Sequence, residues 1–306
     1  EAGKKAIDDN FSKYSPVPGY PVLREAIVKK LKQENHLEYA VSEIVVGTGG
    51  KQGVCNAILA LVNPGDEVII PAPYWVSYPQ MVKLAGGVPV IVSAGIEQDF
   101  KITAEQLKHA ITPKTKMIIL CSPSNPTGSV YSAEELESLA KVVLAHDDLF
   151  VLSDEIYEHI NYIGGHCSIA SCQGMKERTI LCNGVSKAYA MTGWRLGWIA
   201  APEWIAKGIN KLQGQYTSGT CSVSQMAAVA AYEADQACVA DYREAFRRRR
   251  DLIVRLAKEI PGLEVNVPQG AFYLFPKCSS YFGKTDGKHV IRSSSDLAMY
   301  ILEEGG

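Results

Sequence analysis

Four polar side chains that could bind a ligand or react with it each follow an apolar run in this sequence. They are Asn125, Asp154, Tyr157 and Lys187. If each run is a strand of a parallel sheet, these side chains meet at the carboxyl edge, where ligands of open α/β sheets bind. A lysine amine in such a crevice can act as a nucleophile and carry protons. The spacing therefore predicts one polar crevice with a reactive amine.

The elements that must position these side chains alternate between strands and helices through the first two-thirds of the chain. This alternation is typical of βα units around a largely parallel sheet, and it predicts a layered α/β fold. Turn sequences at 63–66 and 86–87 end helices where strands begin. Strands are predicted over 43–47, 67–70, 88–92, 115–121, 149–153, 179–183 and 196–200, and helices over 51–62, 74–85, 104–110 and 133–145, the last opened by a Ser132/Glu135 capping box.

The pattern changes after Pro202. Here the sequence predicts helical stretches over about 224–260, two short strands around Glu264 and Phe272, and a last helix from Ser294. We therefore expect a large domain over residues 1–255 and a smaller domain over 256–306. The chain starts at Glu1 without a Met and stops just after a predicted helix, so we expect a fragment at both ends.

Composition excludes several classes of protein. The 306 residues are 47% hydrophobic and 21% charged, and their net charge of -2 offers no basic surface for nucleic acid or anionic lipid. The sequence shows neither a membrane-spanning run nor a signal peptide. Eight scattered cysteines without a CxxC pair predict reduced, mostly buried thiols in a cytoplasmic protein. We expect no metal site at His166, Cys167 and Cys172, because zinc ligands are usually more tightly paired.

Further motifs accompany the four side chains. Asn125 lies in Asn-Pro-Thr-Gly, Asp154 in Asp-Glu-Ile-Tyr, and Arg195 follows Lys187 by eight residues in Thr-Gly-Trp-Arg-Leu-Gly-Trp. In this order they resemble the class I aminotransferases, fold-type I enzymes that use pyridoxal 5′-phosphate, and within them the prokaryotic aspartate aminotransferase branch. The resemblance extends from the Tyr14 segment to Gly-Ala-Phe-Tyr at 270–273. It implies a three-layer, mostly parallel large domain and a smaller α+β C-terminal domain, incomplete here.

The resemblance implies catalytic roles for Lys187, Asp154 and Tyr157. Lys187 would condense with the cofactor aldehyde and, once released, carry protons. Asp154 would hold a proton on the pyridine nitrogen, which makes the ring a better electron sink. Tyr157 and Asn125 would donate hydrogen bonds to the phenolic oxygen of the cofactor. Asn125 would also contact the α-carboxylate of the substrate.

The resemblance also implies a site for the cofactor phosphate. Gly50 and Lys51 open a predicted helix after a strand, as in the phosphate cup of the family, and Arg195 would supply a guanidinium. Tyr14 resembles the tyrosine that reaches the phosphate of the neighbouring subunit, which implies a homodimer with shared active sites. One departure is Gly184, where many relatives have a phosphate-binding serine.

Substrate contacts follow from the same resemblance. Trp75 matches the aromatic residue stacked on the pyridine ring, whereas we expect Trp194 and Trp198 to be core residues. Lys51 matches a lysine of the prokaryotic aspartate branch that grips the distal carboxylate of acidic substrates. We therefore expect transfer from L-aspartate to 2-oxoglutarate by a ping-pong mechanism. The arginine expected for the α-carboxylate and the closing N-terminal segment fall outside this sequence.

Three alternatives stay open. A transaminase of the same branch would act on prephenate, aromatic amino acids or kynurenine, which only a substrate screen separates. A lyase of the same fold would form product without a 2-oxo acid acceptor. A non-enzymatic regulator would have a helix-turn-helix domain upstream, and this sequence has neither that domain nor a basic patch.

Overall fold

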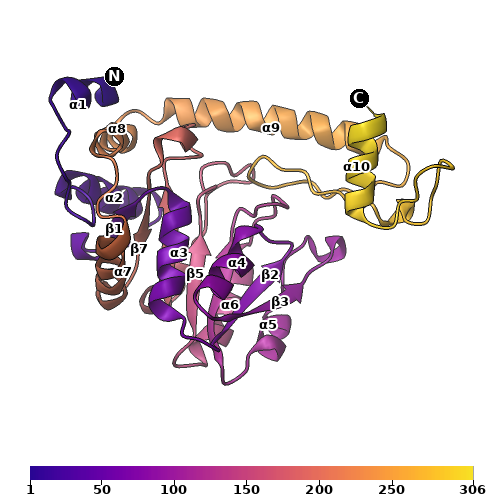
Figure 1. Cartoon of the computed structure of the whole chain (residues 1–306), viewed down its shortest axis with the longest axis horizontal. Helices are drawn as coiled ribbons and strands as arrows, with labels where there is room; N and C mark the ends of the chain where they lie inside the picture. The colour runs from indigo at the N-terminus through magenta and orange to yellow at the C-terminus, as the bar shows by residue number, and fades with distance from the viewer. Residues whose placement is uncertain (306) are drawn as a thin grey trace.

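A seven-stranded mixed sheet forms the centre of the computed structural model, which describes residues 1–305 (Figure 1). The spatial order of the strands is β1-β7-β6-β5-β4-β2-β3. Strand β7 is antiparallel to both of its neighbours, and the other pairs are parallel. The strands are β1 (Ile44–Gly47), β2 (Glu67–Ala72), β3 (Val88–Ser93), β4 (Thr115–Cys121), β5 (Phe150–Asp154), β6 (Thr179–Gly184) and β7 (Gly197–Ala200).

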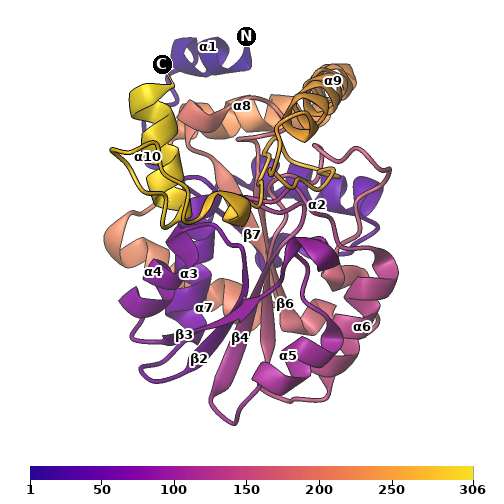
Figure 2. The ribbon, with the colours of Figure 1, turned by 90° about the vertical axis from the view of Figure 1, so that its right-hand side faces the viewer.

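Helices cover both faces of this sheet (Figure 2). Buried side chains of α3 (Gly50–Leu61), α4 (Ser77–Leu84) and α7 (Glu203–Tyr216) form a core with one face. Strands buried on both faces are apolar along their whole length, which explains their continuous hydrophobic runs. The opposite face packs against α2 (Pro21–Glu34), α5 (Ala104–Ala110), α6 (Ala133–Leu144) and α8 (Ser222–Glu233).

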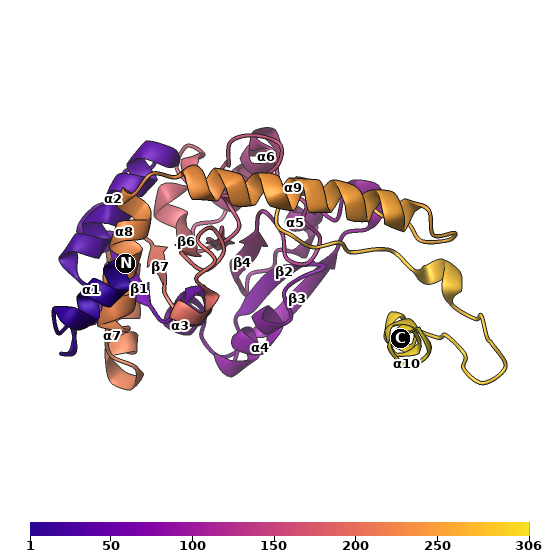
Figure 3. The ribbon, with the colours of Figure 1, turned by 90° about the horizontal axis from the view of Figure 1, so that it is seen from above.

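The remaining helices lie outside these two layers. They are α1 (Ala2–Asp8), the long α9 (Ala237–Lys258), and α10 (Ser294–Glu304), which lies beyond the edge of the sheet in Figure 3. Phe246 of α9 packs in a small apolar cluster with Tyr157 and Ala271, so α9 contacts the segment that follows β5. Short 3-10 helices lie at Val41–Glu43, Ile96–Gln98, Ile169–Ser171, Lys176–Arg178, Thr192–Trp194 and Ser279–Tyr281.

The α/β class and all seven predicted strands are confirmed, with ends that differ by one or two residues. The Ser132/Glu135 capping box is also formed, since each side chain accepts a hydrogen bond from the backbone of the other residue. The helix predicted from Tyr74 begins instead at Ser77. Helices α1, α2 and α7 were not predicted, and the predicted region 224–260 is two helices, separated between Glu233 and Ala237.

Three expectations are wrong. The strands around Glu264 and Phe272 are only an isolated bridge from Glu264 to Lys277 and a bridge from Asn161 to Gly270. Trp198 is buried, but Trp194 is 42% exposed because its 3-10 turn lies outside the sheet. The eight cysteines are free, as expected, yet only Cys182 among them is buried in residues 1–305.

None of the helices described is long and apolar enough to cross a membrane.

Candidate active site

A cavity of about 360 Å³ lies beside the carboxyl ends of β4, β5 and β6. Eight of the residues predicted for the site line it, while Tyr14 is not among its lining residues in the described chain. The eight are Gly50, Lys51, Trp75, Asn125, Asp154, Tyr157, Lys187 and Arg195, and the cavity is completed by Tyr78, Cys121, Ile156, Ser186, Thr192 and Tyr273.

Asp154 is the last residue of β5 and is almost completely buried. Its Oδ2 accepts a hydrogen bond of 2.7 Å from the Tyr78 hydroxyl, and its Oδ1 accepts one of 3.3 Å from the Ile156 backbone N–H. Burial raises the pKa of Asp154, and these two hydrogen bonds oppose the shift by favouring the ionised carboxylate. The carboxylate is thus oriented by fixed donors and can hold a cationic N–H.

Lys187 follows β6 by three residues and is partly buried. Its Nζ lies 5.5 Å from the centre of the Tyr157 ring and 5.6 Å from that of Phe272. Burial lowers the pKa of Lys187 below the ordinary lysine value. A larger share of the amine is therefore neutral near pH 8, and only the neutral amine is nucleophilic.

Tyr157 places a buried phenol between Lys187 and the C-terminal segment. Its hydroxyl is hydrogen-bonded to the hydroxyl of Tyr273, and its ring packs edge-on against Phe272 at 5.5 Å. Burial, followed by the contact with Tyr273, raises the pKa of Tyr157 far above the ordinary tyrosine value. The phenol therefore stays protonated at neutral pH and is a hydrogen-bond donor. Asn125, half-buried in the loop after β4, adds an amide.

The start of α3 has the features of an anion site. Gly49 has φ of +81°, which glycine adopts without strain, and no side chain caps the helix that begins at Gly50. Arg195 donates to the Thr192 carbonyl at 2.9 Å and to the Thr48 carbonyl at 3.4 Å. A Cβ at Gly49 would lie 2.5 Å from Arg195 Nη2. Glycine thus lets backbone N–H groups and a guanidinium come together, as a phosphate requires.

The structure gives a steric reason for Gly184. Gly184 pairs with Gly197 across β6 and β7, and a Cβ at Gly184 would lie 2.7 Å from Gly197 Cα and 2.8 Å from the Leu196 carbonyl. Gly197 in turn pairs with Gly47 of β1. Three glycines thus lie side by side under the start of α3. A serine at position 184 would not fit this backbone arrangement without a shift of β7.

Trp75 and Lys51 lie together at the cavity. The Trp75 ring stands edge-on to Tyr78, with centroids 5.3 Å apart, and Lys51 Nζ lies 4.8 Å from the centre of the Trp75 ring. Lys51 is exposed at the cavity, so its ammonium is available to an anion that enters. The sequence placed both residues here only through the resemblance, because a tryptophan before a helix is usually a core residue.

Sequence reasoning missed Tyr78 and Tyr273, the hydroxyl partners of Asp154 and Tyr157. They are 76 and 116 residues away from those partners along the chain. One signal was present for Tyr78: it follows Trp75 by three residues at the start of a helical pattern, where such residues share a face. Nothing comparable marked Tyr273 as more than part of the Gly-Ala-Phe-Tyr motif.

We predict that Tyr78→Phe weakens both cofactor binding and transamination. The Asp154 carboxylate would lose one of its two donors inside a buried site, and a hydrogen bond to a charged group contributes roughly 1.5–3 kcal/mol, or about 10- to 100-fold. Titration with pyridoxal phosphate and single-turnover kinetics would measure this loss. Tyr131→Phe is a matched control, since Tyr131 is equally buried and its hydroxyl accepts the Ile102 N–H at 3.0 Å. Equal losses in the two variants would contradict the prediction.

The donor set of this cavity fits pyridoxal phosphate. One cavity is lined by a group for each part of the cofactor. These groups are a carboxylate for the pyridine nitrogen, an amine for the aldehyde, a phenol and an amide for the phenolic oxygen, and a guanidinium with helix N–H groups for the phosphate. The glycines at positions 49 and 197 let the guanidinium and the start of α3 come close to the backbone, because a Cβ would lie 2.5 Å from Arg195 Nη2 at position 49 and 2.2 Å from the Gly50 nitrogen at position 197. The individual roles of these residues stay predictions.

Comparisons with known proteins agree with this fit. The family described as aminotransferase class I and II matches residues 1–306. The chain is 48% identical to an aspartate/prephenate aminotransferase of Cereibacter sphaeroides, covering 100% of this chain and 77% of the relative. It is 49% identical to a bifunctional aspartate aminotransferase and glutamate/aspartate-prephenate aminotransferase of Petunia hybrida, covering 99% of this chain and 64% of that relative.

The structural comparison leads to the same family. The crystal structure of the aspartate aminotransferase from Rhizobium meliloti superposes with a TM-score of 0.96 at 43% identity, over 99% of this chain and 76% of that chain. The mixed sheet and its helical layers are thus the fold of these enzymes, as the motifs predicted. The chain therefore belongs to the class I and II aminotransferases and is a transaminase dependent on pyridoxal phosphate.

Proposed function

We propose that this transaminase moves the amino group of L-aspartate to 2-oxoglutarate in two half-reactions. The observation that carries the proposal is the exposed Lys51 ammonium at the cavity that also contains Lys187 and Asp154. Both proposed substrates have a second carboxylate, and a cation at the cavity favours them over neutral amino acids. The names of the relatives from Cereibacter sphaeroides and Petunia hybrida support aspartate as a substrate.

Bound pyridoxal phosphate supplies an aldehyde for the amino group and a ring that accepts electrons from the substrate Cα. In our proposal the Lys187 amine acts as a base that takes the proton from the substrate Cα, and it then acts as an acid that gives a proton back. The lowered pKa of Lys187 assists the first of these roles. Asp154 keeps the pyridine nitrogen protonated, and Tyr157 and Asn125 donate to the phenolic oxygen. Arg195 and the N–H groups at Gly50 bind the phosphate.

The substrate is bound by three of these residues in the proposal. Asn125 contacts the α-carboxylate, Trp75 lies against the ring system, and Lys51 pairs with the distal carboxylate. Lys51 is the second residue of α3, where the helix dipole disfavours a cation. An anionic ligand beside Lys51 would remove this penalty.

Replacement of Lys51 by alanine tests the choice of substrate. We expect the ratio of kcat/KM for L-aspartate to that for L-alanine to fall about tenfold or more, because a charge-assisted contact with only one of the two substrates is lost. Steady-state assays with 2-oxoglutarate give the ratio. Lys83→Ala, at an exposed position of α4, is the control. An unchanged ratio in the Lys51 variant would refute the assignment of acidic substrates while leaving transaminase chemistry intact.

Prephenate is a second candidate acceptor. The relatives from Cereibacter sphaeroides and Petunia hybrida have prephenate in their names, and prephenate offers a carboxylate on its ring in addition to its 2-oxo acid group. The same Lys51 ammonium could bind that carboxylate. A screen of 2-oxo acid acceptors with L-aspartate as donor would rank prephenate against 2-oxoglutarate, and a screen of donors would include aromatic amino acids and kynurenine.

We further propose a cytoplasmic homodimer with shared active sites. Tyr14 supports the dimer, because its side chain is 96% exposed and is suited to reach the phosphate site of a second copy. The division into a large cofactor-binding domain over 1–255 and a smaller domain over 256–306 is part of the same proposal. The two bridges that replace predicted strands near Glu264 and Gly270 lie close to this boundary.

A further inference from the structure

The turn that follows β5 carries two buried carboxylates in addition to the cavity residues. Asp154 and Tyr157 line the cavity, and Glu155 and Glu158, the next residue in each case, are 1% and 6% exposed. Neither Glu155 nor Glu158 is among the residues that line the cavity. Residues 156–159 form a turn without strand partners. Backbone hydrogen bonds from Glu158 to Glu155 and from Ile160 to Tyr157 close the turn, and side-chain contacts link it to neighbouring segments.

Glu158 is bound by a lysine from a distant helix. Lys30 of α2 is 3% exposed, and its Nζ forms an ion pair with Glu158 Oε1 and a hydrogen bond of 2.7 Å to Asn35 Oδ1. Asn35 Nδ2 donates to Glu158 Oε2 at 2.8 Å. Both oxygens of Glu158 are thus bound by residues of α2 and its C-terminal cap.

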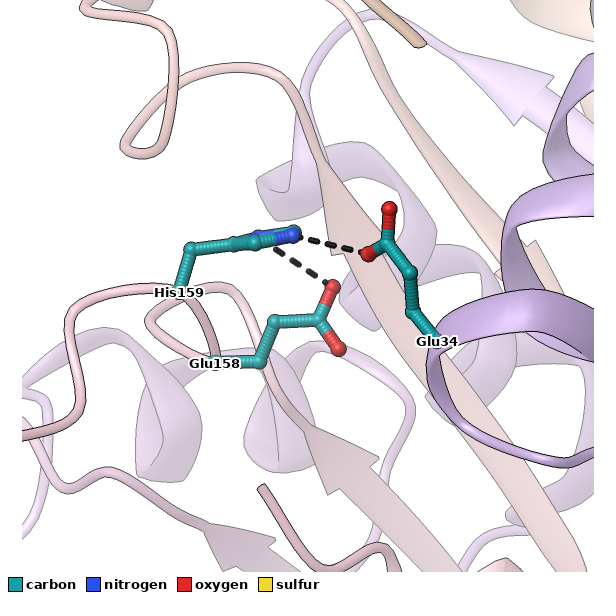
Figure 4. Close-up of side chains that lie close together, drawn as sticks. All are labelled: Glu34, Glu158 and His159. Atoms are coloured by element: carbon teal, nitrogen blue, oxygen red, sulfur yellow. Dashed lines mark hydrogen bonds and ion pairs between the residues drawn. The ribbon is translucent and has the colours of Figure 1, made fainter. Parts of the chain in front are cut away.

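The surroundings of this pair add further charges. In Figure 4 the His159 ring faces the carboxylates of Glu34 and Glu158, with His159 Nε2 2.9 Å from Glu34 Oε2 and Nδ1 3.4 Å from Glu158 Oε1. Lys30 Nζ is 3.6 Å from Glu34 Oε2. Although burial favours the neutral acid, Lys30 keeps the pKa of Glu158 well below its ordinary value. The Glu158 carboxylate is therefore ionised at neutral pH.

Glu155 is held as firmly from its own side of the turn. Its Oε1 accepts from the Ser153 hydroxyl at 2.7 Å and the Ser168 hydroxyl at 2.6 Å, and its Oε2 lies 2.7 Å from His166 Nε2. Burial opposes protonation of His166, but the Glu155 carboxylate raises its pKa. A carboxylate oxygen of Glu155, a carboxylate oxygen of Glu158 and a ring nitrogen of His166 lie within 4.8 Å of one another. The contacts of Glu155 and those of Glu158 therefore form one connected cluster.

The Lys30–Glu158 pair is not explained by stability alone. Two charges lose most of their hydration when buried, and replacing a buried pair by apolar side chains of similar size is often neutral or stabilising. What the pair does provide is a directional link, because Lys30 can neutralise Glu158 only with the turn in one position. A displacement of about 1 Å at a catalytic group can reduce the rate by about a hundredfold.

We propose that Lys30 is a positioning residue, which acts through Glu158 to fix the turn that follows Asp154 and carries Tyr157. The proposal rests on the cofactor-binding roles proposed above for Asp154 and Tyr157. The N-terminal helix α2 thereby controls the placement of groups that follow β5, although it does not line the cavity.

The test separates placement of the turn from stability. The double variant Lys30→Met/Glu158→Leu removes both charges and keeps side-chain volume, and Lys32→Met/Glu38→Leu is the matched control, an exposed pair from the same region with a separation of 3.1 Å. Three quantities are measured: the melting temperature without cofactor, the Kd for pyridoxal phosphate, and the pH midpoint of the visible band of the bound cofactor.

We expect the buried double variant to melt within a few degrees of the parent chain, to bind pyridoxal phosphate about tenfold or more weakly, and to show a shifted pH midpoint. The control pair should match the parent in all three. A folded double variant with the Kd and pH midpoint of the parent would overturn the proposal. If this variant does not fold, the single variant Glu158→Gln is tested by the same three measurements. The single variant Lys30→Arg keeps the cation and should give the values of the parent chain.

The same experiment distinguishes failure of the inference from failure of the proposed function. If the parent chain forms no visible band with pyridoxal phosphate, or keeps that band when Lys187 is replaced, the roles assigned to the cavity residues are wrong. If the parent shows the band and the buried double variant behaves like it, only the role of Lys30 is wrong.

Discussion

Replacement of Lys187 by alanine should reduce transamination at least about a thousandfold and abolish the visible band of the bound cofactor. The Lys187 amine can both condense with an aldehyde and shuttle a proton, and removal of a positioned acid–base group alone costs about 10²- to 10⁴-fold. Burial lowers the pKa of Lys187, so the parent chain presents a neutral amine more readily than a surface lysine does. Single-turnover kinetics with L-aspartate would measure the loss.

A lysine outside the cavity provides the control for this experiment. Lys176 is partly exposed and pairs with Glu43 at 3.3 Å, so Lys176→Ala should leave the spectrum and the rate unchanged. Added methylamine should restore part of the activity of the Lys187 variant, because it replaces the missing amine without replacing the side chain. A Lys187 variant that turns over within tenfold of the parent would assign the chemistry to another residue.

The second large effect is expected for Asp154→Asn, which keeps the shape of the side chain and removes its charge. Asparagine cannot hold a proton on the pyridine nitrogen, so the ring becomes a poorer electron acceptor. We expect kcat to fall by about 10²- to 10³-fold, the range found when one electrostatic contact to developing charge is removed. The half-reaction with L-aspartate, followed by the loss of the visible band, gives the rate.

The size of this effect depends on the environment of Asp154. The carboxylate is buried and accepts hydrogen bonds from Tyr78 and Ile156, so solvent screens its charge only weakly. Asp148→Asn is the control, because the side chain of Asp148 is 90% exposed. If the Asp154 variant were to keep a kcat within threefold of the parent, the carboxylate would not act on the pyridine nitrogen.

The location of the site could be predicted from the sequence because it depends on strand ends. Asn125, Asp154 and Lys187 follow buried apolar strands that hydropathy identifies, and parallel strands bring such positions to one edge. Arg195, Trp75 and Lys51 came from the family resemblance, since their spacing alone fits ordinary turns and helix starts.

Contacts between distant segments could not be predicted in the same way. The separations along the chain are 76 residues for Tyr78 and Asp154, 116 for Tyr273 and Tyr157, and 128 for Lys30 and Glu158. No local pattern encodes pairs so far apart. Helix α2 was missed as well, and it begins with Pro21 at its first position, a helix signal that was available. The exposure of Trp194 depends on a 3-10 turn that leaves the sheet, which hydropathy does not show.

The reversed direction of β7 has a consequence for how the site responds to local opening. Because β7 runs against β6, residues before β7 and residues after β6 lie at the same edge, and the one connection from Gly184 to Gly197 carries both Lys187 and Arg195. The proposed nucleophile and the proposed phosphate-binding cation are thus held by the hydrogen bonds of one antiparallel pair rather than by a helix crossover. In hydrogen exchange, the amides of β6 and β7 should remain protected while those of the outer helices α9 and α10 exchange. The chain should therefore keep the cofactor bound during partial unfolding.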